Sequence, residues 1–292
     1  MQRRDRDSSR PLEEVLSWHP LADVAWRAAS EAALFLHRER PHDLAVETKS
    51  TPTDVVTAMD KAAEVLVRDR LLAERPGDGL LGEEGSERRG TTGIRWVVDP
   101  LDGTVNYLYR IPHWGVSVAA VEETVPTDTG ASVVGVIITP ETGEGFVGIR
   151  GHGAWRAVDG VAERLSVREC SELSQAMVST GFGYAATRRS LQVDVLRSII
   201  TSVRDIRRSG SAVVDFTWLA QGRTDAYYER GLNAWDMAAG TLIAQEAGAV
   251  FSDLGGSSGD GTFLVAVSGI AAELERLLIH AGIHDDEGGV GS

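Results

Sequence analysis

Two aspartates at the end of an apolar run offer the clearest chemistry in the sequence. Residues 96–106 read WVVDPLDGTVN, so Asp99 and Asp102 follow a β-branched run and precede a glycine and a threonine. Pro100 cannot donate a sheet hydrogen bond, so pairing is expected to stop there and to leave both carboxylates at a strand end. The small residues that follow can open a helix whose free N–H groups favour an anion. We therefore expect a cation site beside a phosphate site, with an ordinary Asp-Gly turn as the alternative.

Three further acids lie where elements begin or end. Glu83 ends a short apolar run and stands between glycines, whereas Asp60 and Asp236 each stand near the start of an expected helix. Each has an ordinary explanation: an exposed loop for Glu83, and stabilisation of a helix N-terminus for the two aspartates. The alternative is that these acids lie beside Asp99 and Asp102 and take part in the same site.

Four of these acids come from strand ends or helix starts, the positions that converge on a cleft: Glu83, Asp99, Asp102 and Asp236. Four like charges within a few ångström are strongly destabilising unless they are protonated or neutralised by cations. Mg²⁺ takes carboxylate, carbonyl and water oxygens and leaves positions open for phosphate. The set therefore predicts a magnesium site that can accept a phosphate ester.

The elements that must position these acids fall into two halves. Residues 11–170 predict an N-terminal lobe with helices at 21–40 and 60–70 packed on a mainly antiparallel sheet, with strands at 115–121, 132–139 and 145–149 and a hairpin pattern over 151–167. Residues 171–283 alternate strands and helices and predict a C-terminal α/β lobe with a largely parallel sheet. Residues 1–10 and 284–292 are expected to be disordered tails. The predicted fold class is therefore α/β (α+β), with the site in the cleft between the lobes.

Composition excludes several classes of partner. The 292 residues carry a net charge of −14, which argues against nucleic acid or an anionic membrane surface as the main partner. Cys170 is the only cysteine, so neither an intrachain disulfide nor a thiolate metal cluster is expected. No stretch approaches the roughly 18 apolar residues of a membrane span, and residues 1–10 lack the apolar core of a signal peptide. We therefore expect a soluble, cytoplasmic protein.

Four stretches, in this order along the chain, resemble the inositol monophosphatase family of metal-dependent sugar phosphatases. They are KSTPTDVVTAMD at 49–60, GEEG at 82–85, DPLDGTVN at 99–106 and WDMAAG at 235–240, and the similarity extends over residues 21–279. The resemblance implies a layered α/β/α/β/α sandwich and a homodimer. It also implies Mg²⁺-dependent hydrolysis of phosphate monoesters that is inhibited by lithium.

The resemblance also assigns metal ligands and catalytic residues. The residues that match a first Mg²⁺ site are Glu83, Asp99 and the backbone carbonyl of Leu101, and those that match a second site are Asp99, Asp102 and Asp236. Two or three ions are implied, with Mn²⁺ as a substitute. Asp60 and Thr104 match the pair that, together with Glu83, orients the attacking water.

Substrate contacts follow from the same resemblance. The backbone N–H groups of Gly103 and Thr104 match phosphate contacts, and Asp102 and Asp236 also match substrate-binding positions. Contacts to sugar hydroxyls are matched by Gly210, Ser211, Ala212 and Glu229, and a mobile-loop lysine is matched by Lys49. The implied substrate is therefore a small phosphorylated polyol or sugar.

Physical chemistry is consistent with these roles. A bound metal lowers the pKa of water from about 15.7 toward neutrality, so hydroxide forms without a strong base. Hydrolysis by this hydroxide requires no covalent phosphoenzyme. The leading hypothesis is hydrolysis of myo-inositol 1-phosphate. The alternatives are the same chemistry on fructose 1,6-bisphosphate, 3′-phosphoadenosine 5′-phosphate or histidinol phosphate, and, in a different class, a non-catalytic regulatory protein on the same fold.

Overall fold

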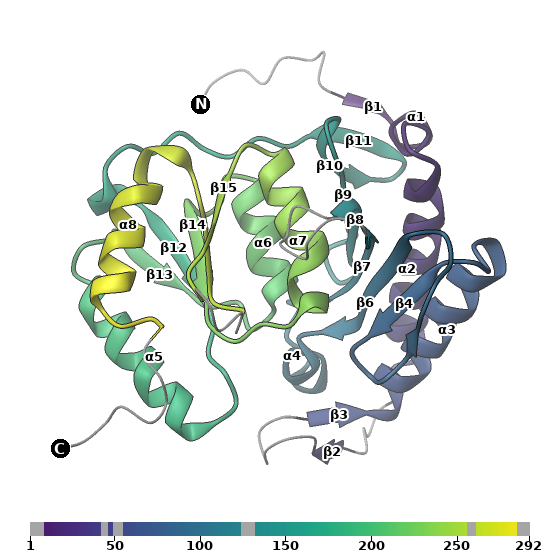
Figure 1. Cartoon of the computed structure of the whole chain (residues 1–292), viewed down its shortest axis with the longest axis horizontal. Coiled ribbons are helices and arrows are strands. Elements are labelled where there is room, and N and C mark those ends of the chain that lie inside the picture. Colours follow the sequence, from purple (N-terminus) through teal and green to yellow (C-terminus); the bar gives the residue numbers. More distant parts are fainter. Residues whose placement is uncertain (1–8, 42–45, 49–54, 124–131, 256–260, 285–292) are drawn as a thin grey trace.

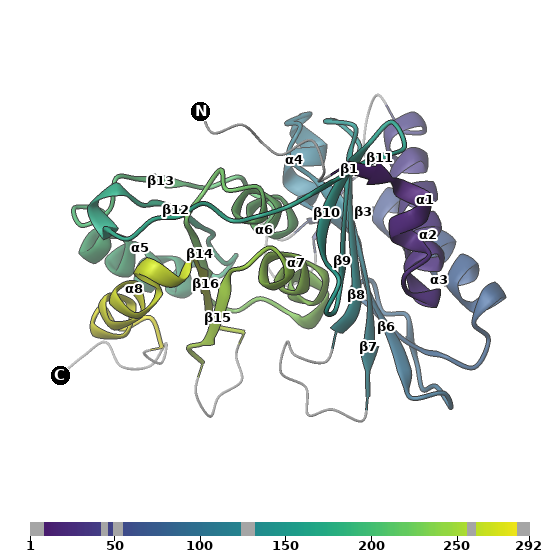
Figure 2. The same ribbon diagram turned by 90° about the horizontal axis from the view of Figure 1, so that it is seen from above.

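The computed structural model describes residues 9–41, 46–48, 55–123, 132–255 and 261–284. Its elements form layers in the order helix, sheet, helix, sheet, helix (Figure 1, and seen from above in Figure 2). This confirms the predicted layered α/β/α/β/α architecture. The family resemblance supplied that order, because the pairing of one layer with the next depends on contacts that are distant in sequence.

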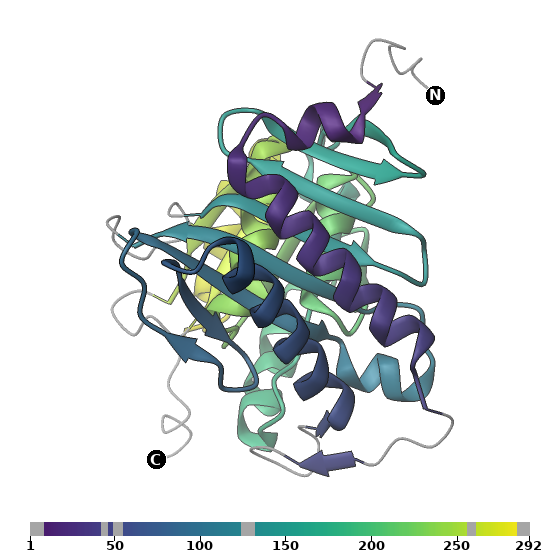
Figure 3. The ribbon, with the colours of Figure 1, turned by 90° about the vertical axis from the view of Figure 1, so that its right-hand side faces the viewer.

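The outer layer consists of α1 (Leu12–Leu16), α2 (Pro20–Arg38) and α3 (Ala58–Glu74). Figure 3 shows α2 and α3 crossing one face of the large sheet. The inner face of α2 is rich in buried alanines, which let its backbone lie close to the strands. Helix α3 begins two residues earlier and ends four residues later than the range 60–70, because Thr57 and Asp60 form a capping box and the apolar stripe continues to Leu71.

The large sheet has its strands in the order β1-β11-β10-β9-β8-β7-β6-β4-β5, and only β4 and β6 pair in parallel. Their bounds are β1 Ser9–Pro11, β4 Gly79–Gly82, β5 Glu87–Arg88, β6 Ile94–Asp102, β7 Gly115–Glu122, β8 Ser132–Thr139, β9 Glu144–Ile149, β10 Gly153–Val158 and β11 Val161–Arg164. The assignment of Ser9 and Arg10 to a disordered tail was wrong, because both pair with β11. A separate pair is formed by β2 (Val46–Thr48) and β3 (Val55–Thr57).

Strand β6, which lies between β7 and β4, carries the central motif at its C-terminal end. Its pairing with β7 is regular as far as Asp99, shifts register over the next residues and resumes at Asp102. The prediction that pairing stops at Pro100 was thus right only locally, since a bulge tolerates the missing N–H and the strand continues. Helix α4 (Thr104–Tyr109) follows directly, and Gly103 precedes it in the left-handed region, with φ 88°.

The second sheet has the order β13-β12-β14-β16-β15, with bounds β13 Asp205–Arg207, β12 Met177–Thr180, β14 Ala226–Glu229, β16 Phe263–Ala266 and β15 Val250–Asp253. It is mixed rather than largely parallel: β12 pairs in parallel with β13 and β14, whereas β16 is antiparallel to both its neighbours. Only residues 254–262 connect β15 to β16, and so short a link cannot make a parallel crossover. Helices α5 (Ala186–Ile199) and α8 (Ser268–His280) cover its outer face, and a short 3₁₀ helix, Leu173–Gln175, precedes β12.

Helices α6 (Ala212–Ala220) and α7 (Ala234–Glu246) lie between the two sheets (Figure 2). Helix α7 packs tightly on the large sheet, because two strand positions lack a side chain: Gly135 of β8 faces the backbone of Ala239, and Gly148 of β9 faces Ile243. A helix from the C-terminal half therefore rests on the N-terminal sheet, and the two predicted lobes share this middle layer.

The substitution Gly135→Ala is expected to destabilise the protein. The new methyl carbon would lie 2.8 Å from the Cα and carbonyl oxygen of Ala239, so the backbone of α7 must move. Overpacking of this kind costs about 1–3 kcal/mol of unfolding free energy, which urea denaturation can measure. An unfolding free energy within roughly 0.5 kcal/mol of wild type, the scatter of neutral substitutions, would contradict this close packing.

Candidate active site

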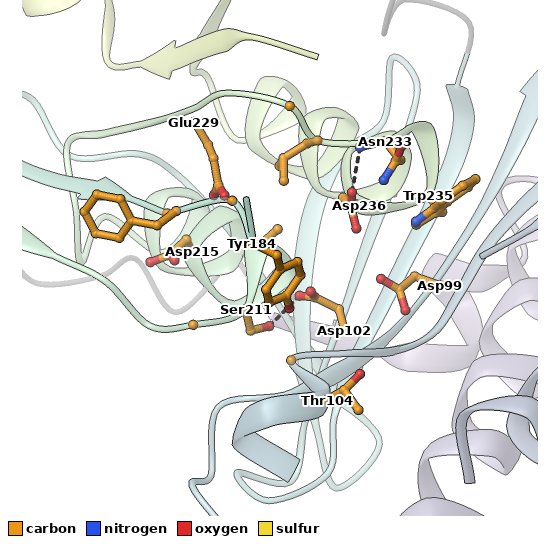
Figure 4. A pocket seen from close by; sticks show the side chains of 18 of the residues that line it. Asp99, Asp102, Thr104, Tyr184, Ser211, Asp215, Glu229, Asn233, Trp235 and Asp236 are labelled. Atoms are coloured by element: carbon orange, nitrogen blue, oxygen red, sulfur yellow. Dashed lines mark hydrogen bonds between the residues drawn. The ribbon is translucent and has the colours of Figure 1, made fainter. Parts of the chain in front are cut away.

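A cavity of about 540 Å³ lies where β6 ends and the middle helices begin (Figure 4). Residues from both halves of the chain form its walls. Eleven predicted site residues are among them: Glu83, Asp99, Leu101, Asp102, Gly103, Thr104, Gly210, Ser211, Ala212, Glu229 and Asp236. Asp60 contacts one of these residues, whereas Lys49 falls outside the described residues.

Three aspartates form the acidic centre of this cavity. One carboxylate oxygen from each of Asp99, Asp102 and Asp236 lies within 4.8 Å of the others. Asp99 and Asp102 come from the end of β6, and Asp236 comes from the first turn of α7, where it also accepts a hydrogen bond of 2.6 Å from the backbone N–H of Asn233. Asp236 is thus both a helix cap and a member of the cluster.

Burial and mutual repulsion disfavour the charged state of these carboxylates. Desolvation first, and then the charges of Glu83, Asp102 and Asp236, raise the pKa of Asp99 well above its usual range. Burial and the neighbouring acids likewise raise the pKa of Asp236, and burial raises that of Asp102 to about 6. Hard divalent cations prefer negatively charged carboxylate oxygens as ligands, so the three aspartates fit such an ion.

Glu83 and Leu101 stand beside the aspartates. Glu83 follows β4 in the turn to β5 and lines the cavity, although its carboxylate is not one of the three that cluster within 4.8 Å. Its charge nevertheless raises the pKa of Asp99. The carbonyl oxygen of Leu101 lies 3.1 Å from the hydroxyl of Thr104.

Asp60 and Thr104 form a buried hydrogen-bonded pair. The Thr104 hydroxyl lies 2.9 Å from one carboxylate oxygen of Asp60, and the other oxygen accepts hydrogen bonds from the backbone N–H and hydroxyl of Thr57. Asp60 therefore caps α3 and contacts Thr104 at the same time, so the two interpretations of this residue are compatible. Burial raises the pKa of Asp60, while the hydrogen bonds from Thr57 and Thr104 lower it.

Asp102 joins the end of β6 to the start of α6. One of its oxygens accepts from the hydroxyl of Ser211 at 2.5 Å and from the backbone N–H of Val213 at 2.8 Å. The Ser211 hydroxyl also stands 3.4 Å from the N–H of Val214 as the cap of α6. Ser211, a predicted sugar contact, thus donates a hydrogen bond to Asp102 of the cluster in this structure.

The opposite wall of the cavity belongs to the second sheet. Glu229, at the end of β14, accepts a hydrogen bond of 2.6 Å from the hydroxyl of Tyr227. Burial raises the pKa of Glu229 to about 7, although the hydrogen bond from Tyr227 and the charge of Arg208 act to lower it. Gly181 makes room for this carboxylate, because a Cβ there would overlap it.

Sequence reasoning missed several residues that line the cavity. Asp215 is the clearest: it is buried on α6, accepts a hydrogen bond of 2.6 Å from Ser209 and has a pKa raised by burial to about 7. The signal was present as a lone acid within the apolar run AVVDFTWLA. Others come from the loop before α5, the first turn of α5 and the loop after β14, where no pattern distinguishes a lining residue from an exposed one: Phe182, Tyr184, Arg188, Arg230 and Leu232.

An acidic cavity between the sheets of an α/β/α/β/α sandwich is the arrangement that the resemblance to the metal-dependent sugar phosphatases led us to expect. A sequence model of the inositol monophosphatase family matches residues 17–285, and the chain belongs to that family. The match spans both halves of the chain.

Individual relatives agree with this assignment. The chain is 41% identical over 271 residues to a Mycobacterium tuberculosis protein named inositol-1-monophosphatase SuhB, covering 87% of this chain and 91% of that one. It is 35% identical over 241 residues to the Escherichia coli Nus factor SuhB, covering 82% and 86%. The crystal structure of the extragenic suppressor protein SuhB from Bartonella henselae superposes with a TM-score of 0.79 at 33% identity, covering 89% and 98%.

One further observation concerns membranes. Among the helices of the described ranges, none combines the length and the apolar character needed to cross a bilayer.

Proposed function

We propose that the protein is a Mg²⁺-dependent phosphomonoesterase that hydrolyses myo-inositol 1-phosphate to inositol and phosphate. The observation that carries the proposal is the clustering of Asp99, Asp102 and Asp236 within 4.8 Å in a cavity whose far wall presents Glu229. The name of the Mycobacterium tuberculosis relative, inositol-1-monophosphatase, supports the choice of substrate.

The metal ligands follow the family assignment. Glu83, Asp99 and the carbonyl of Leu101 would hold one Mg²⁺, and Asp99, Asp102 and Asp236 a second, with Mn²⁺ as a substitute and a third ion as an option. When bound, such ions lower the pKa of water and neutralise charge on the phosphate and the leaving oxygen. All of these residues line the same cavity, which supports a shared function.

Thr104 and Asp60 would position the attacking water. Because the Thr104 hydroxyl donates to Asp60, its oxygen keeps lone pairs with which to accept a hydrogen bond from water. Glu83 faces the same cavity and would orient the water from its other side. A positioned water suffices for in-line attack, so no side chain is assigned as a nucleophile.

The substrate would lie between the two walls. The N–H groups of Gly103 and Thr104 would contact the phosphate beside Asp102 and Asp236, while Glu229 would accept hydrogen bonds from the polyol. Gly210, Ser211 and Ala212 would contact the hydroxyls of the sugar, and Lys49, which matches a lysine near the family's active site, would be a further contact. The hydrogen bond from Ser211 to Asp102 suggests that this serine also fixes a metal ligand.

A substrate panel tests the proposal. Phosphate release from myo-inositol 1-phosphate is expected to require Mg²⁺ and to fall when lithium is added. The comparison esters are fructose 1,6-bisphosphate, 3′-phosphoadenosine 5′-phosphate and histidinol phosphate. A clear preference for one of these would replace the substrate while keeping the chemistry.

The same panel decides against catalysis if it gives no turnover at all. The Escherichia coli relative is named a Nus factor, so a non-catalytic regulatory role is the alternative of a different class. Absence of phosphate release from every ester with either Mg²⁺ or Mn²⁺ would favour that role.

We also propose a cytoplasmic homodimer. The family resemblance supports the dimer, and the net charge of −14 supports partners other than nucleic acid or anionic membranes.

A further inference from the structure

The turn from β4 to β5 carries Glu83 into the cavity, and its backbone is tied down at several points. Gly82 donates its N–H to the carbonyl of Ser86 at 2.7 Å, which closes the turn. Glu83 donates its own N–H to the carbonyl of Val98 in β6 at 3.2 Å. The turn is thereby attached to the strand that ends in Asp99.

A buried glutamate outside the cavity holds the rest of this turn. One carboxylate oxygen of Glu64 accepts the backbone N–H of Glu84 at 2.6 Å, and the other accepts that of Ser86 at 2.9 Å. Glu64 is only 3% exposed, although it is a charged residue. Hydrogen bonds to a carboxylate in such a setting are about twice as strong as neutral ones, so the two bonds fix the backbone on both sides of the turn.

Helix α3 supplies both this contact and the one to Thr104. Glu64 stands four residues after Asp60, and residues at that spacing share one helix face. Asp60 binds the Thr104 hydroxyl, while Glu64 binds the turn of Glu83. One rigid helix thus holds two separate parts of the candidate site in a common frame.

Gly82 is matched to this arrangement. A Cβ at Gly82 would overlap the carboxylate of Glu64, so the close approach of helix and turn depends on the missing side chain. Glu64 and Gly82 therefore act as one contact, and either can be changed to disturb it.

We propose that Glu64 is a positioning residue that fixes Glu83 for metal binding. It acts through the backbone N–H groups of Glu84 and Ser86 and does not itself enter the cavity. The inference rests on the proposed function, since it assigns Glu83 to the metal site. A buried carboxylate with no task beyond stability would affect folding but would leave the affinity for metal unchanged.

The test uses the full chain with Glu64→Gln, which keeps the size of the side chain but has a single acceptor oxygen. Mg²⁺ binding by isothermal titration calorimetry and the Mg²⁺ concentration for half-maximal phosphate release are measured together. Both are expected to weaken by roughly 10-fold or more, the usual loss when the group orienting a metal ligand is removed. Gly82→Ala retains Glu64 but displaces its carboxylate, and it is expected to weaken Mg²⁺ binding in the same way.

Val67→Ala is the matched control, because Val67 lies on the same helix and is fully buried in the core, but its side chain has no polar atom that could bind the backbone of the turn. It is expected to lower the thermal midpoint and to leave Mg²⁺ affinity unchanged. Unchanged affinity in Glu64→Gln and Gly82→Ala would overturn the inference, as would an equal loss in Val67→Ala. A wild-type protein that neither binds Mg²⁺ nor releases phosphate would instead refute the proposed function, and the wild type alone reveals that case.

Discussion

Asp99→Asn is expected to abolish phosphate release and, at the same time, to stabilise the metal-free protein. Asp99 is the proposed bridge between two ions and lies within 4.8 Å of both other cluster aspartates. Metal ions supply several kcal/mol of transition-state stabilisation, so losing the bridging charge is expected to lower kcat/KM by at least about 10³-fold.

The gain in stability has the same origin as the loss of activity. Burial and the neighbouring acids raise the pKa of Asp99, which means that its charged form destabilises the metal-free folded state. Asparagine has nearly the same shape and removes that charge. The thermal midpoint of the variant in chelator is therefore expected to exceed that of wild type at neutral pH.

Phosphate release and thermal unfolding of the same preparations check both halves of this prediction. Asp69→Asn is a suitable control, because Asp69 is exposed on α3 and, within the described part of the chain, pairs with the adjacent Arg68. It is expected to change neither quantity appreciably. Near wild-type turnover in Asp99→Asn would refute the bridging role, and a lower thermal midpoint would show that Asp99 stabilises the fold instead.

Local patterns predicted strands of the large sheet well. The range 132–139 matches β8 at both ends, and 115–121 and 145–149 match β7 and β9 to within one residue, since apolar, β-branched runs broken by turn residues define their own ends. Helix ends were less exact. The capping box of Thr57 and Asp60 is visible in the sequence as Thr-x-x-Asp, yet the helix was expected to start only at residue 60.

Contacts between distant segments could not be predicted from such patterns. The hydrogen bond from Ser211 to Asp102 spans 109 residues, and those from the turn to Glu64 span 20 and 22. The placement of α7 against β8 depends on Gly135, which in the sequence resembles any glycine within a strand. Motif spacing therefore identified candidate acids, whereas the residues that hold them in place became apparent only from the fold.

The stability of the metal-free protein is expected to fall as pH rises from about 4 through neutrality. The cluster aspartates have folded-state pKa values above the ordinary value of 3.8: about 6 for Asp102, and well above the usual range for Asp99 and Asp236. Between the unfolded and folded pKa values the folded state binds more protons, so the unfolding free energy decreases with pH. Stability from these groups is thus fully present at low pH and is lost as pH passes their folded-state values.

Mg²⁺ is expected to counter the decrease in stability with pH that the cluster aspartates cause. A ligand at 100 times its dissociation constant adds about 2.7 kcal/mol, which for a chain of this size corresponds to a rise of about 5 °C in the thermal midpoint. Binding needs deprotonated carboxylates, so the rise is expected to be large at pH 7.5 and small at pH 5. Thermal unfolding with Mg²⁺ or with chelator at several pH values measures it.

The two sides of the cavity are expected to respond differently to the ion. Burial raises the pKa values of Asp215 and Glu229 to about 7, and these carboxylates are not among the proposed metal ligands. Mg²⁺ is therefore expected to remove only part of the decrease in stability with pH. Asp99→Asn is expected to lose most of the rise in thermal midpoint that Mg²⁺ causes, while keeping the pH dependence that Asp215 and Glu229 contribute. If Mg²⁺ does not raise the thermal midpoint at pH 7.5, or raises it equally in Asp99→Asn, the ion does not bind among the three aspartates.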